Sequence, residues 1–375
     1  MAVEIVKIDT EQRRQVDRFI QVPFDIYKDS PYWVPPLWDD ARLQLNRKKN
    51  PYYTHSDADF FVAVKDGRDV GRIALLDNRR HNEYKKERTG FFYLFDSIDD
   101  LEVSRALFGK AEEWCRAHGF NKLFGPKGFI AMDGFGILIQ GFDYLPALGI
   151  PYNYPYYEKL VTDWGFQKYT DVYSCYFAGE MDIDKRIYEI ADRVRERKGI
   201  TIRKFKNKKE LRAAVPAIVK AYNETFVDNW EFVPVLESEA NAVLERLIDI
   251  AEPDLIKLAV QGDQIIGFLL AYPNIGEALQ KIKGRLWPFG FITILRSVKT
   301  TKRLDLNGVG VLPKYQGGGA TAVMYAEMAR TVRESRFEFA ELVQMEEKNI
   351  KIQSELKMLG ATFFKTHRLY EKAVQ

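Results

Sequence analysis

The sequence predicts a mixed α/β fold that occurs twice along the chain. Three pairs of segments resemble each other at nearly the same spacing, and such self-similarity indicates a duplicated structural unit. The second members contain the same mixture of strand-like and helix-like patterns as the first. The matched residues are Gly71 with Gly267, Pro35 with Pro234, and Gly165 with Gly360, at offsets of 196, 199 and 195.

Each half contains the same elements in the same order. The first strands are expected at 3–8 and 200–205, and the hairpins at 60–76 and 256–272, each with a polar turn containing glycine. A further strand, a long helix, another strand, a short helix and a closing strand follow. The long helices are expected at 101–118 and 320–335. This order is typical of a mixed sheet with flanking helices.

The boundary between the halves falls in a charged segment with helical spacing of its apolar residues. Ile183, Ile187, Ile190 and Val194 recur as one face of a helix would require. We therefore predict a first domain at 1–180, a linker helix at 181–199 and a second domain at 200–375. Two domains also agree with a length of 375 residues.

Composition and charge narrow the class of protein. The 56 basic and 53 acidic residues give a net charge of +3, so we expect no nucleic-acid partner. Cys115 and Cys175 lack metal-ligand spacing, so we expect reduced, packed thiols and no metal site. The sequence has no recognisable secretory leader and no apolar run of about 20 residues, which predicts a cytoplasmic location.

A glycine-rich stretch in the second half, DLNGVGVLPKYQGGGATAVMYAEMAR at 305–330, is the most informative local pattern. Gly308 and Gly310 interrupt a strand, which predicts a bulge or a close ligand. The glycines at 317–319 lead directly into a helix, whose N-terminus could bind phosphate; a flexible tight turn is the alternative. The loop has neither the lysine nor the position of the familiar nucleotide-binding loops.

At these residues the sequence resembles the GNAT superfamily of acetyl-CoA-dependent N-acyltransferases. Its signature is a basic or amide residue, two variable places, glycine, one variable place, and glycine or alanine. Gln316, Gly319 and Thr321 occupy the fixed places, and Thr321 departs from the pattern. The order of elements up to the closing YEK at 370–372 is also similar. The resemblance implies two tandem acyl-CoA N-acyltransferase-like domains, with specific motifs only in the second.

The resemblance also implies which residues hold acyl-CoA. The backbone at Val309 and Val311 would contact the pantetheine, and Asn349 would lie near the thioester. Asn349 is also well placed to cap the helix at 350–359, and the two roles are compatible. The residues expected at the pyrophosphate are Gln316, Gly317, Gly318, Gly319, Ala320 and Thr321.

The catalytic groups are less clearly marked. Many members of the superfamily place a tyrosine seven residues after the asparagine, but this chain has Leu356 there. Tyr370 or water would then protonate the departing thiolate. Asp305 and Glu346 are the carboxylates expected to take a proton from the acceptor ammonium, directly or through water. On residue type alone, a solvated surface position is the commoner role for each of these carboxylates.

The first half lacks the glycine loop. At the corresponding place it carries four acids, which suit a helix N-terminus but would repel a pyrophosphate. We therefore expect a degenerate first domain without a CoA site. These acids are Asp96, Asp99, Asp100 and Glu102.

The segment 273–303 of the second half is longer than its counterpart, with seven Lys or Arg around a group of apolar residues. Three roles stay open for it: a lid over an acyl chain, a contact with a membrane surface, or packing against the first half.

Together these observations predict an enzyme that moves an acetyl or longer acyl group from CoA to an amine of a small molecule or peptide. A non-catalytic scaffold or ligand sensor with the same fold is one alternative. An aminoacyl-tRNA-dependent transferase is another, although it would be helped by more basic charge. The sequence does not indicate an oligomeric state.

Overall fold

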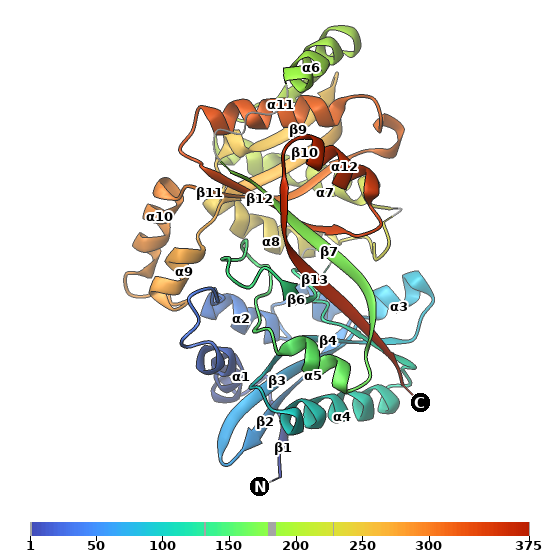
Figure 1. Cartoon of the computed structure of the whole chain (residues 1–375), viewed down its shortest axis with the longest axis vertical. Coiled ribbons are helices and arrows are strands. Elements are labelled where there is room, and N and C mark those ends of the chain that lie inside the picture. The colour runs from blue at the N-terminus through green and yellow to red at the C-terminus, as the bar shows by residue number, and fades with distance from the viewer. Residues whose placement is uncertain (1, 131–132, 179–184, 228, 375) are drawn as a thin grey trace. The chain divides into compact units, whose positions relative to one another are not determined.

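The computed structural model describes residues 2–130, 133–178, 185–227 and 229–374. The chain, drawn in Figure 1, forms two compact units. Unit 1 comprises Met1–Tyr173, Gly276–Gly290 and Lys365–Gln375, and unit 2 comprises Ser174–Ile275 and Phe291–Phe364. Two stretches from the second half of the sequence therefore belong to unit 1. The predicted domain boundaries at 180 and 200 separate the sequence halves, and they stay a prediction.

Unit 1 is a mixed sheet with helices. Its strand order is β1-β2-β3-β4-β5-β13-β7, and β6 pairs with β13. The strands are β1 (Glu4–Lys7), β2 (Asp57–Lys65), β3 (Arg68–Asp77), β4 (Thr89–Ser97), β5 (Lys122–Gly125), β6 (Ile137–Gln140), the part of β7 (Gln167–Ala178) up to Tyr173 and the part of β13 (Thr362–Ala373) from Lys365. The helices are α1 (Arg13–Ile26), α2 (Trp38–Leu45), η1 (Pro51–Thr54), α3 (Arg79–Lys85), α4 (Leu101–Ala117), α5 (Tyr157–Asp163) and α9 (Gly276–Ile282).

Unit 2 repeats this plan, with strand order β7-β12-β11-β10-β9-β8. Besides the remaining parts of β7 and β13, its strands are β8 (Ile200–Arg203), β9 (Ile256–Gln261), β10 (Gln264–Pro273), β11 (Arg303–Val311) and β12 (Phe339–Glu346). The helices are α6 (Lys185–Lys198), α7 (Lys208–Thr225), α8 (Glu237–Ile250), η2 (Pro253–Leu255), α10 (Gly290–Thr300), η3 (Pro313–Tyr315), α11 (Ala320–Arg333) and α12 (Ile350–Met358). The predicted duplicated α/β fold is confirmed.

Helices cover both faces of the sheet in unit 2. Phe268 of β10 packs against Tyr222 and Phe226 of α7. The next residue, Leu269, belongs to the apolar core formed with α11. Because successive side chains of a strand point to opposite faces, α7 and α11 lie on opposite sides of β10.

The predicted linker helix is α6, and it packs along α11 within unit 2 (Figure 1). Arg195 of α6 forms an ion pair of 2.8 Å with Glu327 of α11. Residues 181–184 of the predicted linker lie outside the described residues.

The predicted bulge is present where β10 pairs with β11. Leu269 lies opposite Val309, whereas Ala271 lies opposite Leu306, so β11 contains one additional residue at this point. Gly308 has a φ of +119°, which is strained for residues with a side chain. The glycine in the strand therefore marks a real change of backbone direction.

Both cysteines are buried free thiols, as expected. Within the described ranges, no group of three or more His, Cys, Asp or Glu residues could hold a metal ion. No helix in those ranges is both long and apolar enough to cross a membrane.

A buried ion pair anchors the core of unit 1. Arg72 of β3 lies 2.7 Å from Asp96 of β4, and both side chains are almost inaccessible to solvent. Arg72 also donates to the carbonyl of Phe19 in α1, and the Tyr27 hydroxyl donates to Asp96. Asp96 is one of the four acids that replace the glycine loop, and its role here is structural.

We expect Arg72→Leu to lower the free energy of unfolding by about 3–5 kcal/mol, because it leaves the Asp96 carboxylate buried without its cation. The control is Arg105→Leu, which removes the half-exposed pair with Asp163 and should cost less than about 1 kcal/mol. Urea denaturation followed by circular dichroism measures both. Equal losses for the two variants would contradict the assigned role of the buried pair.

Candidate functional site

The glycine loop of unit 2 adopts a backbone that only glycine enters readily. Gly317 and Gly319 have φ values of +72° and +93°, in the left-handed region. The N–H of Gly318 donates to the carbonyl of Tyr315 at 3.1 Å and closes the turn. Gly319 is the N-cap residue of α11, so backbone alone begins this helix.

This backbone makes the start of α11 a suitable place for an anion. The first N–H groups of a helix have no partner within it, and the helix dipole adds partial positive charge. The ammonium of Lys198, at the end of α6, lies 2.9 Å from the carbonyl of Gly318. Gln316 Nε2 donates to the carbonyl of Val311 at 3.2 Å and ties the loop to β11. Ala320 and Thr321 form the first turn of the helix.

The strand that leads into the loop separates from one of its neighbours. In the part of the chain that the structure describes, β11 pairs with β12 over Arg303–Leu306 only. Its pairing with β10 continues to Val311. The segment that contains Val309 and Val311 therefore lies beyond the end of the β11–β12 pairing, where an extended ligand could contact strand backbone.

A buried hydroxyl lies beside this part of β11. A Cβ atom built on Gly310 would lie 2.4 Å from Cγ2 of Thr225, so glycine is required for α7 to approach the strand. Thr225 Oγ1 has no hydrogen-bond partner among the described residues. Buried polar atoms are normally hydrogen-bonded, so this hydroxyl fits a site that takes a polar ligand.

Asp305 lies in a buried polar cluster on β11. Asn274 Nδ2 donates to both of its carboxylate oxygens, at 2.9 and 3.0 Å. Tyr272 lies opposite Asp305 on β10, and Glu341 lies opposite it on β12. Burial, reinforced by the Asp305 carboxylate, raises the pKa of Tyr272 above its usual value. The structure therefore excludes a solvated surface position for Asp305, which is 1% exposed.

Sequence reasoning missed the residues that surround Asp305. Asn307 Nδ2 donates to the Tyr272 hydroxyl at 2.7 Å, which brings a further amide into the cluster. Glu341 is fully buried, and burial together with its charge raises the pKa of Cys175 to about 12. The available signal was Glu341 itself, a carboxylate between the apolar residues Ala340 and Leu342 of β12.

Glu346 is the last residue of β12, Asn349 follows three residues later, and both have local structural roles. The Glu346 carboxylate accepts from the N–H of Lys348 at 3.0 Å. Asn349 caps α12 by accepting from the N–H of Ile352 at 3.4 Å, which is the capping role expected from the sequence. Gly360 follows the helix with a φ of +83°, as a glycine after a helix C-terminus does.

Tyr370 belongs to unit 1, whereas the glycine loop belongs to unit 2. It lies opposite Gly125 of β5, and its hydroxyl donates to Glu158 at 3.3 Å. Burial raises its pKa above the usual value. Leu356, at the place of the superfamily tyrosine, is fully buried in α12. The geometry of unit 2 thus adds no support to a proton-donor role for Tyr370.

In unit 1 the equivalent helix start is occupied by side chains. Asp100 caps α4 by accepting from the N–H of Glu102 at 2.9 Å. Lys65 forms ion pairs of 2.6 and 2.7 Å with Asp100 and Glu102. Carboxylates occupy the place where a phosphate would bind, so this helix is unsuited to an anion.

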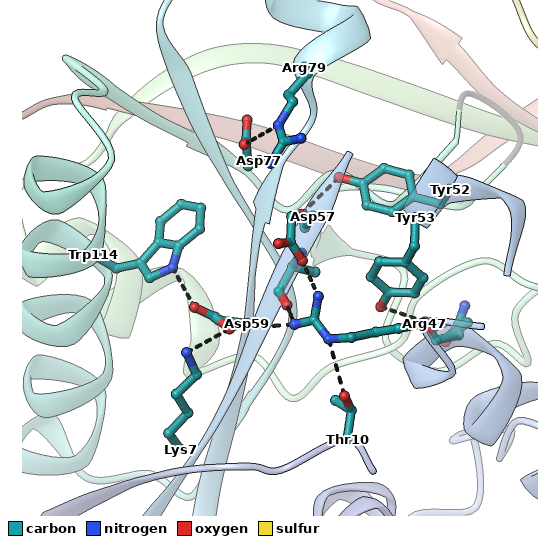
Figure 2. Close-up of polar contacts among 12 residues, drawn as sticks. Lys7, Thr10, Arg47, Tyr52, Tyr53, Asp57, Asp59, Asp77, Arg79 and Trp114 are labelled. Atoms are coloured by element: carbon teal, nitrogen blue, oxygen red, sulfur yellow. Dashed lines mark hydrogen bonds and ion pairs between the residues drawn. The ribbon is translucent and has the colours of Figure 1, made fainter. Parts of the chain in front are cut away.

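A second group of charged residues in unit 1 is paired internally. Figure 2 shows three carboxylates on β2 and β3 facing cations or an indole N–H. These contacts tie β1 and α4 to the hairpin, which explains the cluster as structural. The pairs are Asp57 with Arg47, Asp59 with Lys7 at 2.8 Å and with Trp114 at 3.0 Å, and Asp77 with Arg79 at 2.9 Å.

Comparison with known proteins finds relatives that match along almost the whole chain. Protein YghO of Escherichia coli K12 is 30% identical over 371 residues, covering 96% of this chain and 94% of that protein. A bacterial ceramide synthase of Caulobacter vibrioides is 28% identical over 373 residues, covering 96% and 95%. No protein-family model matches the sequence.

Solved structures share the fold at much lower identity. A tandem GNAT protein from the clavulanic acid biosynthesis pathway has a TM-score of 0.58 at 12% identity, covering 100% of this chain and 99% of that one. A GCN5-related N-acetyltransferase from Sphaerobacter thermophilus has a TM-score of 0.51 at 15% identity, with coverage of 100% and 96%. The likeness to tandem GNAT proteins is therefore one of fold.

The packing of the glycine loop on α6 predicts different costs for two alanine substitutions. Gly317→Ala places a Cβ in open space, so only the left-handed backbone opposes it, at about 1–2 kcal/mol. Gly319→Ala meets the same strain and places its Cβ 2.4 Å from Cγ2 of Val194, so we expect about 1–3 kcal/mol more. Urea denaturation gives both free energies of unfolding.

The second-site variant Val194→Ala distinguishes the cost of backbone strain from the cost of the contact between the new Cβ atom and Val194. Added to Gly319→Ala it should recover part of the loss, and added to Gly317→Ala it should recover none. Equal losses for the two glycine variants, without recovery, would contradict the contact between α6 and the loop.

Proposed function

Because the chain belongs to the same family as E. coli protein YghO and shares its fold with a tandem GNAT protein, we propose that it is an acyl-CoA-dependent N-acyltransferase. Unit 2 binds the acyl-CoA in this proposal. The observation that carries it is the start of α11, where left-handed glycines and Lys198 favour an anion. Unit 1 has carboxylates at the equivalent helix start, which is why we assign one CoA site rather than two.

In this proposal, the residues that the sequence predicts at the pyrophosphate and the pantetheine keep those roles. The pyrophosphate would be held by the N–H groups of the glycine loop from Gln316 to Thr321, with Lys198 adding a positive charge. The pantetheine would follow the backbone at Val309 and Val311, beyond the end of the pairing with β12. When bound, acyl-CoA supplies an acyl group activated as a thioester.

Asp305 is the carboxylate that we propose as the base. It is held in place by Asn274 and lies on the same strand as the pantetheine segment. The acceptor ammonium gives one proton to Asp305, directly or through water, and its nitrogen forms a bond to the thioester carbon. The carbon–sulfur bond breaks, and the second proton passes to the departing thiolate. Glu346 is the second candidate for the base.

We further propose that the acceptor is a long-chain amine. The relative from C. vibrioides is named a ceramide synthase, and a ceramide is the N-acyl derivative of a long-chain amino alcohol. The 28% identity extends along nearly the full length of both chains, so it includes both units. A ligand sensor of the same fold is the competing function, and the buried Leu356 at the place of the tyrosine favours it.

We expect acyl-CoA binding to depend on the charge around the glycine loop. Gly318→Asp puts a carboxylate at the pyrophosphate and should weaken acyl-CoA binding at least about tenfold. Lys198→Gln removes a cation and should weaken it about tenfold. Arg197→Gln, one residue away on the exposed side of α6, should leave it unchanged. Isothermal titration with acetyl-CoA and palmitoyl-CoA measures all four proteins, and unchanged affinity in the first two variants would exclude this cofactor site.

We expect Asp305→Asn to lower kcat about 10²- to 10⁴-fold while acyl-CoA affinity stays unchanged, because a neutral amide cannot accept the ammonium proton. Release of free thiol from palmitoyl-CoA in the presence of sphinganine or short amines gives kcat. Glu346→Gln is the matched comparison. If only the glutamate variant loses activity, the base is Glu346. Binding of acyl-CoA without thiol release by any amine would favour the sensor.

A further inference from the structure

The segment between β10 and β11 concentrates the exposed apolar surface of the described chain. Eleven large hydrophobic side chains are exposed among the described residues, and five of them lie within the nine residues 287–295 of this segment. Soluble surfaces normally scatter such side chains singly, and a concentrated group marks a contact site. The five are Trp287 at 78%, Phe289 at 71%, Phe291 at 42%, Ile292 at 52% and Leu295 at 57% exposure.

The same segment carries a strong positive charge. Residues 281–303 contain seven Lys or Arg and no Asp or Glu, whereas the whole chain has a net charge of only +3. Such a local excess attracts an anionic surface over about one Debye length. The basic residues are Lys281, Lys283, Arg285, Arg296, Lys299, Lys302 and Arg303, of which Lys302 and Arg303 form ion pairs with Glu338 and Glu341.

In α10 the exposed apolar side chains and the basic side chains follow one another along the helix surface. Residues four apart share a helix face, so Phe291, Leu295 and Lys299 form one line and Ile292 and Arg296 form its neighbour. Both lines change from apolar in the first turns to basic toward the C-terminus. Ile294 is 8% exposed and anchors the helix in unit 2.

The residues before α10 extend the apolar group by chain connectivity. Only Gly290 separates Phe289 from Phe291, so their Cα atoms lie within about 7 Å of each other. Trp287 precedes them by two residues. Within unit 1, the preceding part of the segment is fixed by Gln280 Nε2, which donates to the carbonyls of Pro31 and Trp33 at 2.9 Å.

We propose that residues 285–299 bind the surface of a membrane that contains anionic lipids. Tryptophan and phenylalanine occupy the interface between headgroups and acyl chains, and lysine and arginine reach the phosphates beside it. Aromatic and aliphatic tips next to basic side chains, without any acid, fit this surface better than they fit a protein partner of mixed charge. The proposal concerns residues other than those assigned to acyl transfer and does not rest on the proposed function.

Flotation of the full-length protein on sucrose gradients tests the proposal. We expect binding to vesicles of phosphatidylcholine mixed with phosphatidylglycerol, and at least about fivefold weaker binding to phosphatidylcholine alone. The double variant Trp287→Ser/Phe289→Ser should bind the anionic vesicles at least about tenfold less. Arg296→Gln/Lys299→Gln should reduce the difference between the two vesicles. Met358→Ser, which removes an apolar side chain with 74% exposure from α12, should bind as the wild type does.

Quenching of tryptophan fluorescence by brominated phosphatidylcholine in the anionic vesicles reports depth. The brominated lipid should quench part of the tryptophan fluorescence of the wild type. In Trp287→Phe this quenched part of the fluorescence should be absent. The proposal is overturned if the wild type does not float with anionic vesicles, or if the double serine variant floats equally well. It is also overturned if sedimentation velocity shows a wild-type dimer that the double serine variant converts to monomer, because a second copy would then cover the segment.

Discussion

The left-handed backbone at the start of α11 is the constraint on which the candidate site depends. A helix that begins with Gly319 has no N-cap side chain, so its first N–H groups are available to an outside acceptor. The same glycine lets Val194 of α6 approach closely, which in turn places Lys198 against the loop. Gly319 therefore has two effects. It allows α6 to pack against the loop, and it leaves the first N–H groups of α11 accessible to an anion.

The corresponding helix of unit 1, α4, does not begin with glycine and has a different arrangement. In unit 1 the corresponding helix begins with Asp100, whose own carboxylate accepts the N–H of Glu102, and Lys65 neutralises both acids. Asp96 is bound to Arg72 in the core. Side chains of unit 1 thus supply internally the negative charge that unit 2 leaves to a ligand. Of the two helix starts, only that of α11 has no side-chain cap.

Local rules made much of the fold and the loop predictable. The hairpins, the bulge at Gly308, the glycine-headed helix and the Asn349 cap each depend on a few consecutive residues. Features set by strand register were not predictable. The assignment of Lys365–Gln375, and with it Tyr370, to unit 1 depends on pairing with β5, which is distant in the sequence. The residues that surround Asp305 depend on which positions of β10 and β12 lie opposite it. That strand register cannot be read from a single sequence.

Hydrogen exchange in the presence and absence of CoA tests most directly whether one half alone retained a cofactor site. The amides of 316–322 at the start of α11 should exchange more slowly when CoA is added, because they donate to the pyrophosphate. The amides of 97–103 at the start of α4 should exchange at the same rate with and without it. Protection at α4, or no protection at α11 under saturating CoA, would contradict the account.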